Sequence, residues 1–431
     1  MTIKRKFRNM KMKKLFIYIY TFFIFYMPRV SDLCIGVYIE VFSVLLLVLM
    51  LIPWVFTCKN KTTVFKINKN VFWLMFGIFI SALYFAIRAS LGSYDIRIMQ
   101  NLFIIIQIIH VLIIIDFMKY IGFQKDDMIR VLLNLALIQG IITIMMLLFP
   151  SLKSIALSLY YINREENIFI SRMRIYGISG DYTFFTPIYH GILASIAFFY
   201  SIFKERKYLI YLPFILLVIL LNGRFGLLVF VISPIVLALH FILKGKISLK
   251  MIRISIFALI ILVGATLVLS IVAPYTYDWI MSGIEDTIKF FIYNEKSGNY
   301  AALADSHLSF PQGLGAIFGE GYRLFGGQAI EMGYSPSDIG YVNDMFMGGI
   351  IYISILYGAI LKFLFKKPSI NYFVNKNEYD LQLIISKYSV VALLMANYKG
   401  EVMRGGLVLL SVIFIKLITF NESTEGKEVN I

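Results

Sequence analysis

Arginine residues recur in segments that separate the long apolar runs of this sequence, at Arg172, Arg174, Arg224, Arg323 and Arg404. A guanidinium group stays ionised, and its planar donors bind phosphate oxygens in a fork. These residues therefore predict a site for a phosphate-bearing ligand. For Arg172, Arg174 and Arg323, pairing with lipid head groups or carboxylates is the alternative.

Other polar residues near these segments could move a proton or contact the ligand. Asp338, and Asp344 six residues later, could accept a proton from a hydroxyl group, or a carboxylate there could cap a helix. His307 is a second candidate base, although a single loop histidine is more often solvated. Lys399 lies two residues before Glu401, so this pair either neutralises itself or contacts the ligand.

Motifs for metals and nucleotides are missing from the sequence. The four histidines are scattered, with no pair spaced three to five residues apart as in zinc sites. No Gly-Lys-Ser/Thr phosphate loop occurs, and Gly313 to Gly319 lacks the strand-turn-helix setting of a dinucleotide site. We expect no metal and no cofactor, and a tight external turn at 313–319.

The composition shows what class of protein carries these residues. The chain has 431 residues, of which 59% are hydrophobic and 15% are charged, against about 45–50% and about 25% in soluble domains. An ordinary soluble protein is excluded. The net charge of +16 comes from Lys and Arg in short segments between apolar runs, which indicates membrane topology rather than a nucleic-acid partner.

The apolar runs predict an all-α integral membrane protein with about twelve transmembrane helices, forming one polytopic domain over 1–431. The basic N-terminus predicts cytoplasmic termini and an external side with two long loops, 151–183 and 274–340. We expect these loops to fold into a cap, with a helix around Trp279 to Tyr293. The predicted spans are 15–28, 33–56, 71–91, 98–118, 129–149, 184–203, 208–221, 225–243, 252–273, 341–365, 380–397 and 405–420.

The seventh predicted span is short. Residues 208–221 give about 21 Å of helix against a hydrocarbon core of about 30 Å. The turn Asn222-Gly223-Arg224 is therefore expected below the outer membrane surface, where a cation is tolerated only in a protein-lined or water-filled cavity. The alternative is a simple hairpin at the level of the head groups.

Five short motifs, in order along the chain, resemble those of the bacterial O-antigen polymerase family, which is related to the O-antigen ligases. The first resembles the family's Ser-x-Arg-x-Gly-Leu-Leu turn, and the others occupy the loops and the start of the tenth span. The motifs are Asn222 to Leu228, Arg172 to Gly180, Gly313 to Gly321, Ser337 to Ile350, and Lys399 to Glu401.

The resemblance implies a GT-C-like polymerase/ligase architecture in the inner membrane and polymerisation of oligosaccharides linked to undecaprenyl diphosphate at the periplasmic face. It implies functional arginines at Arg172, Arg174, Arg224 and Arg323. A chain-length regulator and a flippase are the implied protein partners. Asp338 lies where the ligases have a His-Asn pair, which favours a polymerase and leaves the base open. An O-antigen ligase or a lipid-linked oligosaccharide flippase is the alternative.

For the substrates that the resemblance implies, the expected chemistry is glycosyl transfer. A sugar hydroxyl attacks the anomeric carbon of a second lipid-linked glycan and expels the lipid diphosphate. In this hypothesis Arg224 and Arg323 bind the diphosphate, Arg172 or Arg174 holds the second carrier, and Asp338 orients or deprotonates the hydroxyl. Neither ATP nor a metal is required, because the carrier bond supplies the driving force.

Overall fold

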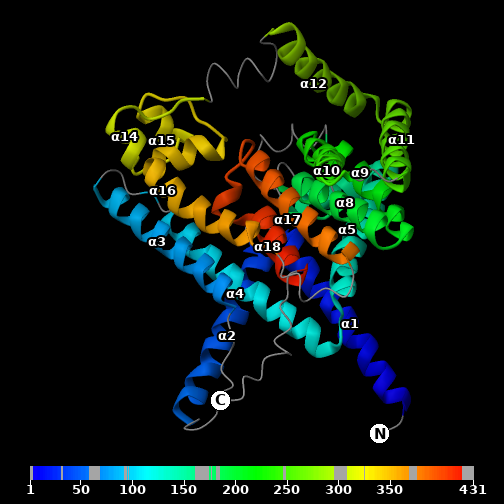
Figure 1. Ribbon diagram of the computed structural model, residues 1–431, viewed down its shortest axis with the longest axis horizontal. Helices are drawn as coiled ribbons and strands as arrows, with labels where there is room; N and C mark the ends of the chain where they lie inside the picture. Colours follow the sequence, from blue (N-terminus) through cyan, green and yellow to red (C-terminus); the bar gives the residue numbers. More distant parts are fainter. Residues whose placement is uncertain are drawn as a thin grey trace.

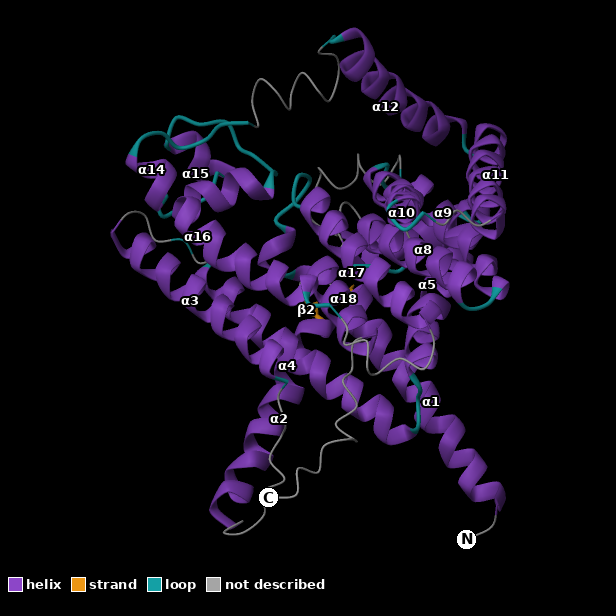
Figure 2. Cartoon of the chain, in the orientation of Figure 1, coloured by secondary structure: helices purple, strands orange, loops and turns teal. Residues whose placement is uncertain are grey.

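The chain is helical over most of its length in a computed structural model that describes residues 3–30, 33–57, 68–91, 95, 97–160, 174–175, 177–180, 185–245, 249–295, 308–324, 326–367 and 376–419 (Figure 2). A helix lies at each of the twelve positions where a span was predicted. Arg172 and His307 lie outside the described residues, so the structure does not place them. The longer helices are α1 (Ile3–Tyr26), α2 (Ile35–Thr57), α3 (Lys69–Leu91), α4 (Ile98–Ile121), α5 (Lys125–Leu148), α8 (Phe185–Phe203), α9 (Tyr211–Asn222), α10 (Phe225–Ile242), α11 (Leu249–Val272), α12 (Pro274–Tyr293), α16 (Gly340–Phe365), α17 (Lys376–Ala396) and α18 (Gly406–Thr419).

Several short elements join these helices. The only described strands pair as a two-residue antiparallel hairpin next to the end of α1. The described residues of the second long loop include α12 and two short helices, so a helix does occupy the segment in which one was expected. The short elements are β1 (Arg29–Val30), β2 (Leu33–Cys34), α6 (Pro150–Tyr160), η1 (Arg206–Ile210), α14 (Leu314–Phe318), α15 (Gly326–Glu331) and η4 (Val402–Arg404).

Eight helices within the described ranges are long and apolar enough to cross a membrane: α3, α4, α5, α8, α10, α11, α16 and α17. Most of α2 and all of α18 are shorter apolar helices. Helices suit this environment because each backbone polar group finds its partner within the segment. The all-α membrane class is therefore confirmed, whereas the number of twelve spans stays a prediction.

The centre of the bundle is α8, whose residues from Thr186 to Ile202 are all buried. Small residues let α10 approach it closely. A side chain on Gly191 would lie 2.4 Å from the carbonyl oxygen of Gly226, and one on Gly226 would lie 2.2 Å from that of Pro187. Close backbone contact through small residues is a common way to pack helices in membranes. This contact fixes the start of α10, immediately after Arg224.

A break in α16 attaches the second long loop to the bundle. Gly349 has φ 65° and ψ −163°, which interrupts the helix. The carbonyl oxygen of Phe346 accepts hydrogen bonds from the backbone N–H groups of Glu320 (2.7 Å) and Gly321 (3.1 Å). In Figure 1, α14 and α15 accordingly lie against the beginning of α16, while α3 runs along both α16 and α4. The loop segment that carries Arg323 is therefore held by main-chain bonds.

Replacing Gly349 by alanine should destabilise the protein. A Cβ there would lie 2.4 Å from the carbonyl oxygen of Ile317, at a φ that L-residues rarely adopt; such strain costs about 1–3 kcal/mol. Gly358, in the same helix, has open space around its Cα, so Gly358→Ala is the matched control. Thermal unfolding in detergent should show a lower midpoint for Gly349→Ala alone. Equal midpoints for both variants would contradict this account of the break.

Candidate functional site

Arg224 is positioned by the turn between α9 and α10. The N–H of Gly223 donates to the carbonyl of Ile219 (2.8 Å), and the N–H of Gly226 donates to the carbonyl of Gly223 (3.1 Å). The Arg224 side chain is half-buried and extends towards α12, where its Nη1 donates to the carbonyl oxygen of Trp279 (2.8 Å). Its guanidinium carbon lies 4.3 Å from the centroid of the Trp279 ring. The turn residue is thus bound to a helix of the second long loop.

Arg174 reaches the same tryptophan from the first long loop, with its guanidinium carbon 5.4 Å from the ring centroid. Residues 175 and 178, which follow Arg174 in the described part of this loop, are bonded to the bundle. The side chain of Gln139 in α5 donates to the carbonyl of Ile178 (2.5 Å) and accepts from its N–H (2.8 Å). The N–H of Ile175 donates to the carbonyl of Leu221 (3.0 Å). These bonds fix the position of the loop, and so keep Arg174 near Arg224 beside the Trp279 ring.

Lys399, in the turn between α17 and α18, completes this group. Burial lowers the pKa of Lys399, the positive charges of Arg174 and Arg224 lower it further, and the nearby carboxylate of Asp338 opposes them. We call Arg174, Arg224 and Lys399, together with Trp279 and Asp338, the cationic cluster. Its three cations and one carboxylate carry a net charge of +2. Such a group attracts a polyvalent anion.

A second group of charges lies deeper and is centred on Arg404, which is fully buried. Its Nε lies 2.5 Å from Oδ1 of Asp344, which is fully buried as well. Its Nη2 lies 2.7 Å from Oε1 of Glu401. Asp344 also accepts a hydrogen bond from the hydroxyl of Tyr357, and that hydroxyl accepts one from Asn397 (2.5 Å). Charges are buried here because each has a partner of the opposite sign.

The same group extends to Arg323 and to the turn between α3 and α4. Nη1 of Arg323 lies 3.4 Å from Oε1 of Glu401, and its Nε lies 3.5 Å from Oδ2 of Asp95. Nη1 of Arg97 lies 3.6 Å from the other carboxylate oxygen of Glu401. We call Arg97, Arg323, Arg404, Asp95, Asp344 and Glu401 the arginine–carboxylate network. Its three cations and three carboxylates give it no net charge.

Glu401 is the hub of this network. Burial alone would raise its pKa, yet Arg404, Arg97 and Arg323 hold the pKa below the ordinary value. Burial would likewise lower the pKa of Arg404, but Glu401 and Asp344 raise it above its ordinary value. Both ions therefore stay charged. An ionised carboxylate shared by three arginines ties together segments that are distant in the sequence.

The turn 397–405 belongs to both groups. Lys399 joins the cationic cluster, and Glu401, on the other side of Gly400, joins the network. The backbone of Asn397 accepts a hydrogen bond from the N–H of Gly340 (2.9 Å), and its side chain accepts one from the N–H of Met403 (3.2 Å). The opposite charges of Lys399 and Glu401 thus interact with different residues, and contact of Lys399 with a ligand stays a prediction.

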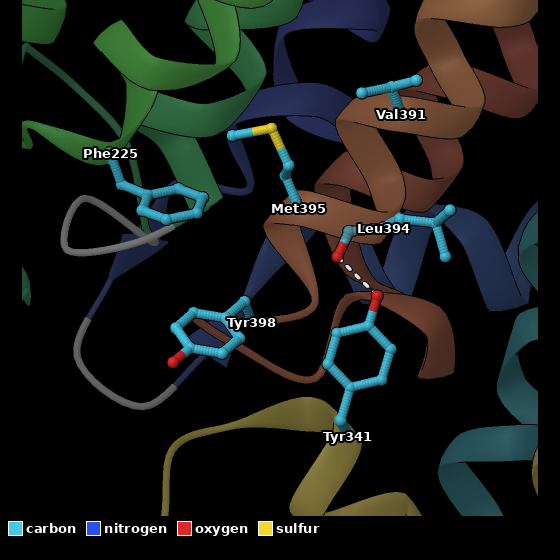
Figure 3. A pocket seen from close by; sticks show the side chains of 6 residues that line it. All are labelled: Phe225, Tyr341, Val391, Leu394, Met395 and Tyr398. Carbon is cyan, nitrogen blue, oxygen red and sulfur yellow. Dashed lines mark hydrogen bonds between the residues drawn. The ribbon is translucent and has the colours of Figure 1, made fainter. Parts of the chain in front are cut away.

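A pocket of about 400 Å³ lies against two of the segments that carry members of the cationic cluster. It lies between the start of α10, the start of α16 and the end of α17, and two of its lining residues, Phe225 and Tyr398, directly adjoin Arg224 and Lys399 in the sequence. Figure 3 shows these two rings and Met395 around the pocket, with the hydroxyl of Tyr341 donating to the carbonyl of Leu394 (2.6 Å). The lining side chains are Phe225, Tyr341, Val391, Leu394, Met395 and Tyr398. The pocket is apolar and suits a hydrocarbon chain.

The predicted site residues that the structure describes fall into these two groups. Arg174, Arg224, Asp338 and Lys399 belong to the cationic cluster, and Arg323 and Asp344 belong to the network. Neither aspartate caps α16: the N-cap residue is Ile339, without a side-chain cap bond, and Asp338 is exposed.

Sequence reasoning did not assign a role to Trp279, Asp95 or Arg97. The pair Asp95 and Arg97 could have been noticed, since both lie in the segment between the third and fourth predicted spans. Nothing in the sequence marks Trp279 as the partner of two arginines, because the three residues come from three separate segments.

Replacing Arg404 by methionine should strongly destabilise the protein, because Asp344 and Glu401 would keep buried charges without their main partner; the expected loss is about 3–5 kcal/mol. Lys119→Met, which breaks an exposed pair with Asp116 (3.6 Å), is the control and should cost about 1 kcal/mol or less. Adding Asp344→Asn to Arg404→Met should restore part of the stability, because Glu401 keeps Arg97 and Arg323 as partners. Unfolding in detergent measures all of these, and a small loss for Arg404→Met would contradict the network's structural role.

Comparisons with known proteins add no family to this picture. No family model, no curated protein and no solved structure matches the chain. The cationic cluster, the network and the apolar pocket of the chain itself therefore carry the functional argument.

Proposed function

We propose that this protein is a membrane glycosyltransferase that polymerises oligosaccharide repeat units linked to undecaprenyl diphosphate into O-antigen or a related surface polysaccharide. The proposal places about twelve spans, of GT-C-like architecture, in the inner membrane with both termini cytoplasmic. It places the cationic cluster at the periplasmic face. A chain-length regulator and a flippase are the proposed partners in polysaccharide biosynthesis.

One observation carries this proposal: the cationic cluster lies beside an apolar pocket. Arg224 and Phe225 are consecutive residues, as are Tyr398 and Lys399. Each of these two segments therefore supplies one cation of the cluster and one residue of the pocket wall. A ligand that satisfies both needs an anionic head and a hydrocarbon tail. A polyprenyl diphosphate has this chemistry, since arginine forks bind phosphate oxygens and the isoprenoid removes apolar surface from water.

The reaction proceeds by displacement at the anomeric carbon of the donor glycan. A hydroxyl oxygen of the acceptor sugar forms the new bond to that carbon, and the bond from the carbon to the diphosphate oxygen breaks. Undecaprenyl diphosphate leaves with the electron pair, and Arg224 and Arg174 stabilise the charge that grows on it. The acceptor hydroxyl loses its proton to a carboxylate, for which Asp338 is the candidate because it is exposed beside Lys399.

Arg323 and Asp344 act indirectly in this proposal. Their ion pairs are with carboxylates and an arginine of the network. They hold the turn 397–405 so that Lys399 stays beside Arg174 and Arg224. Rigid support of this kind keeps charged groups in the geometry that the transition state requires.

Deletion of the gene, followed by gel analysis of the surface polysaccharide, tests the proposed activity. Loss of the polymerase should replace the ladder of chain lengths by a single-unit band. Loss of a ligase would leave no units on the lipid A core, and loss of a flippase would trap the units on the cytoplasmic side. A normal ladder in the deletion strain would reject the proposal.

Arg224→Ala and Arg224→Lys, expressed in the deletion strain, should both fail to restore the ladder. Alanine removes the charge, and lysine keeps it but lacks the planar fork that binds two phosphate oxygens. Losing one such electrostatic contact costs about 10²–10³ in rate. Arg206→Ala is the control, since Arg206 is exposed in η1 and belongs to neither charged group. Full activity of Arg224→Ala, at equal membrane levels, would remove the arginine from the site.

The affinity for inorganic pyrophosphate should fall as the pH rises through the lowered pKa of Lys399, because the cluster then loses one positive charge. Lys399→Arg keeps its charge in that range. The ratio of the two dissociation constants, wild type over Lys399→Arg, should therefore grow towards alkaline pH by a factor on the order of ten. The ionisation of pyrophosphate itself cancels in this ratio. A ratio that does not change with pH would exclude Lys399 from the binding site.

A further inference from the structure

We propose that α12 is the positioning element of the site, in which Trp279 holds the guanidinium groups of Arg174 and Arg224 and Gly283 leaves room for that of Arg224. This inference rests on the proposed function, because it concerns how the two arginines are presented to a diphosphate. Its residues lie in the second long loop, outside the membrane-spanning helices and outside every motif of the sequence analysis.

Trp279 contacts both arginines, although they come from different parts of the chain. The two guanidinium carbons lie 4.3 Å and 5.4 Å from the ring centroid, within the roughly 6 Å range of cation–π attraction. The Trp279 carbonyl accepts one of the N–H groups of Arg224 (2.8 Å). One residue thus fixes the distance and the orientation between two cations that would otherwise repel each other.

Gly283 lies one helical turn after Trp279, on the same face of α12. A Cβ added at Gly283 would lie 1.6 Å from Nη1 and 2.3 Å from the guanidinium carbon of Arg224. Any other residue there would push the guanidinium away. The clash meets only the far end of a flexible side chain, so a substitution should displace Arg224 without disturbing the backbone. Helix propensity alone would favour alanine at this position. The space needed by the Arg224 guanidinium explains why position 283 is a glycine.

The helix itself is anchored to the bundle beside Trp279. Ile280 is 1% exposed and belongs to a buried apolar cluster with Leu221 at the end of α9 and Leu269 in α11. Trp279 is one of the side chains packed against this cluster, to which Ile175, next to Arg174, also belongs. Figure 1 shows α12 continuing from α11 at this edge of the bundle. Trp279 and Gly283, which position the arginines, thus lie on a helix. Sites on helices and strands keep their geometry more precisely than sites on loops.

The consequence is preorganisation. An arginine that is free to rotate must be ordered when a ligand binds, and this ordering weakens the binding. When both guanidinium groups are already held against the Trp279 ring, this entropic cost is not incurred on binding, and the diphosphate binds more tightly. Trp279 and Gly283 then determine how tightly the site holds a diphosphate without touching it themselves.

Equilibrium binding of radiolabelled inorganic pyrophosphate to the full chain in lipid nanodiscs tests this inference. Gly283→Ala and Trp279→Leu should raise the dissociation constant about 5- to 30-fold, the range expected from losing desolvated cation–π contacts. Trp279→Phe keeps a ring and should stay within about threefold of wild type. Gly264→Ala in α11 is the matched control, because nothing lies within 4 Å of a Cβ there. Unfolding temperatures should show that every variant is folded at the temperature of the binding assay.

The outcomes separate this inference from the proposed function. If the wild-type protein does not bind pyrophosphate, the diphosphate site itself is rejected. If the wild type binds and Gly283→Ala and Trp279→Leu bind equally tightly, the diphosphate site survives and the role of α12 is overturned. A dissociation constant for Trp279→Phe as high as that for Trp279→Leu would also overturn the role of the ring.

Discussion

The buried ion pairs of Arg404 are the interaction on which the rest of the site depends. An arginine removed from water is tolerated only if carboxylates compensate its charge, and Asp344 in α16 and Glu401 in the turn 397–405 do so at 2.5 and 2.7 Å. Because Glu401 also pairs with Arg97 and Arg323, one carboxylate connects α4, the second long loop and the last turn. Loosening that hub would release the three segments that carry Arg97, Arg323 and Glu401 from one another.

The two charged groups differ in a way that assigns their roles. The arginine–carboxylate network is balanced, so its arginines are already neutralised by the protein. The cationic cluster carries three positive groups and one carboxylate, and the pKa of Lys399 is lowered by burial and by its cationic neighbours. Charge of one sign held together in this way raises the energy of the unliganded protein, and an anion relieves it. The proposed binding site therefore rests on where the excess charge lies, rather than on the number of arginines.

Glycine residues set the close approaches that bring these groups together. Gly226 allows α10 to touch α8 just after Arg224, and the break at Gly349 frees the carbonyl that binds the second loop near Arg323. Gly283 leaves the space that the Arg224 guanidinium occupies. A methyl group at Gly226 or Gly349 would push two backbone segments apart, and one at Gly283 would displace the guanidinium group of Arg224. The site is thus assembled from loops whose positions are fixed by backbone contacts in the bundle.

The sequence by itself determined that the protein is helical and belongs in a membrane, because apolar runs of the right length admit no other backbone in lipid. It also marked Arg174, Arg224 and Lys399, because the positive-inside bias disfavours cations in the predicted external segments, and it marked Asp338 as a carboxylate in one of those segments. Only the tertiary structure decided which charges meet. Arg323 lies with Asp95 and Glu401, and Arg174 lies with Arg224 on Trp279, although these partners are far apart along the chain. Pairing across the bundle depends on helix packing and close backbone contact. Neither of these leaves a periodic pattern or a fixed spacing in the sequence.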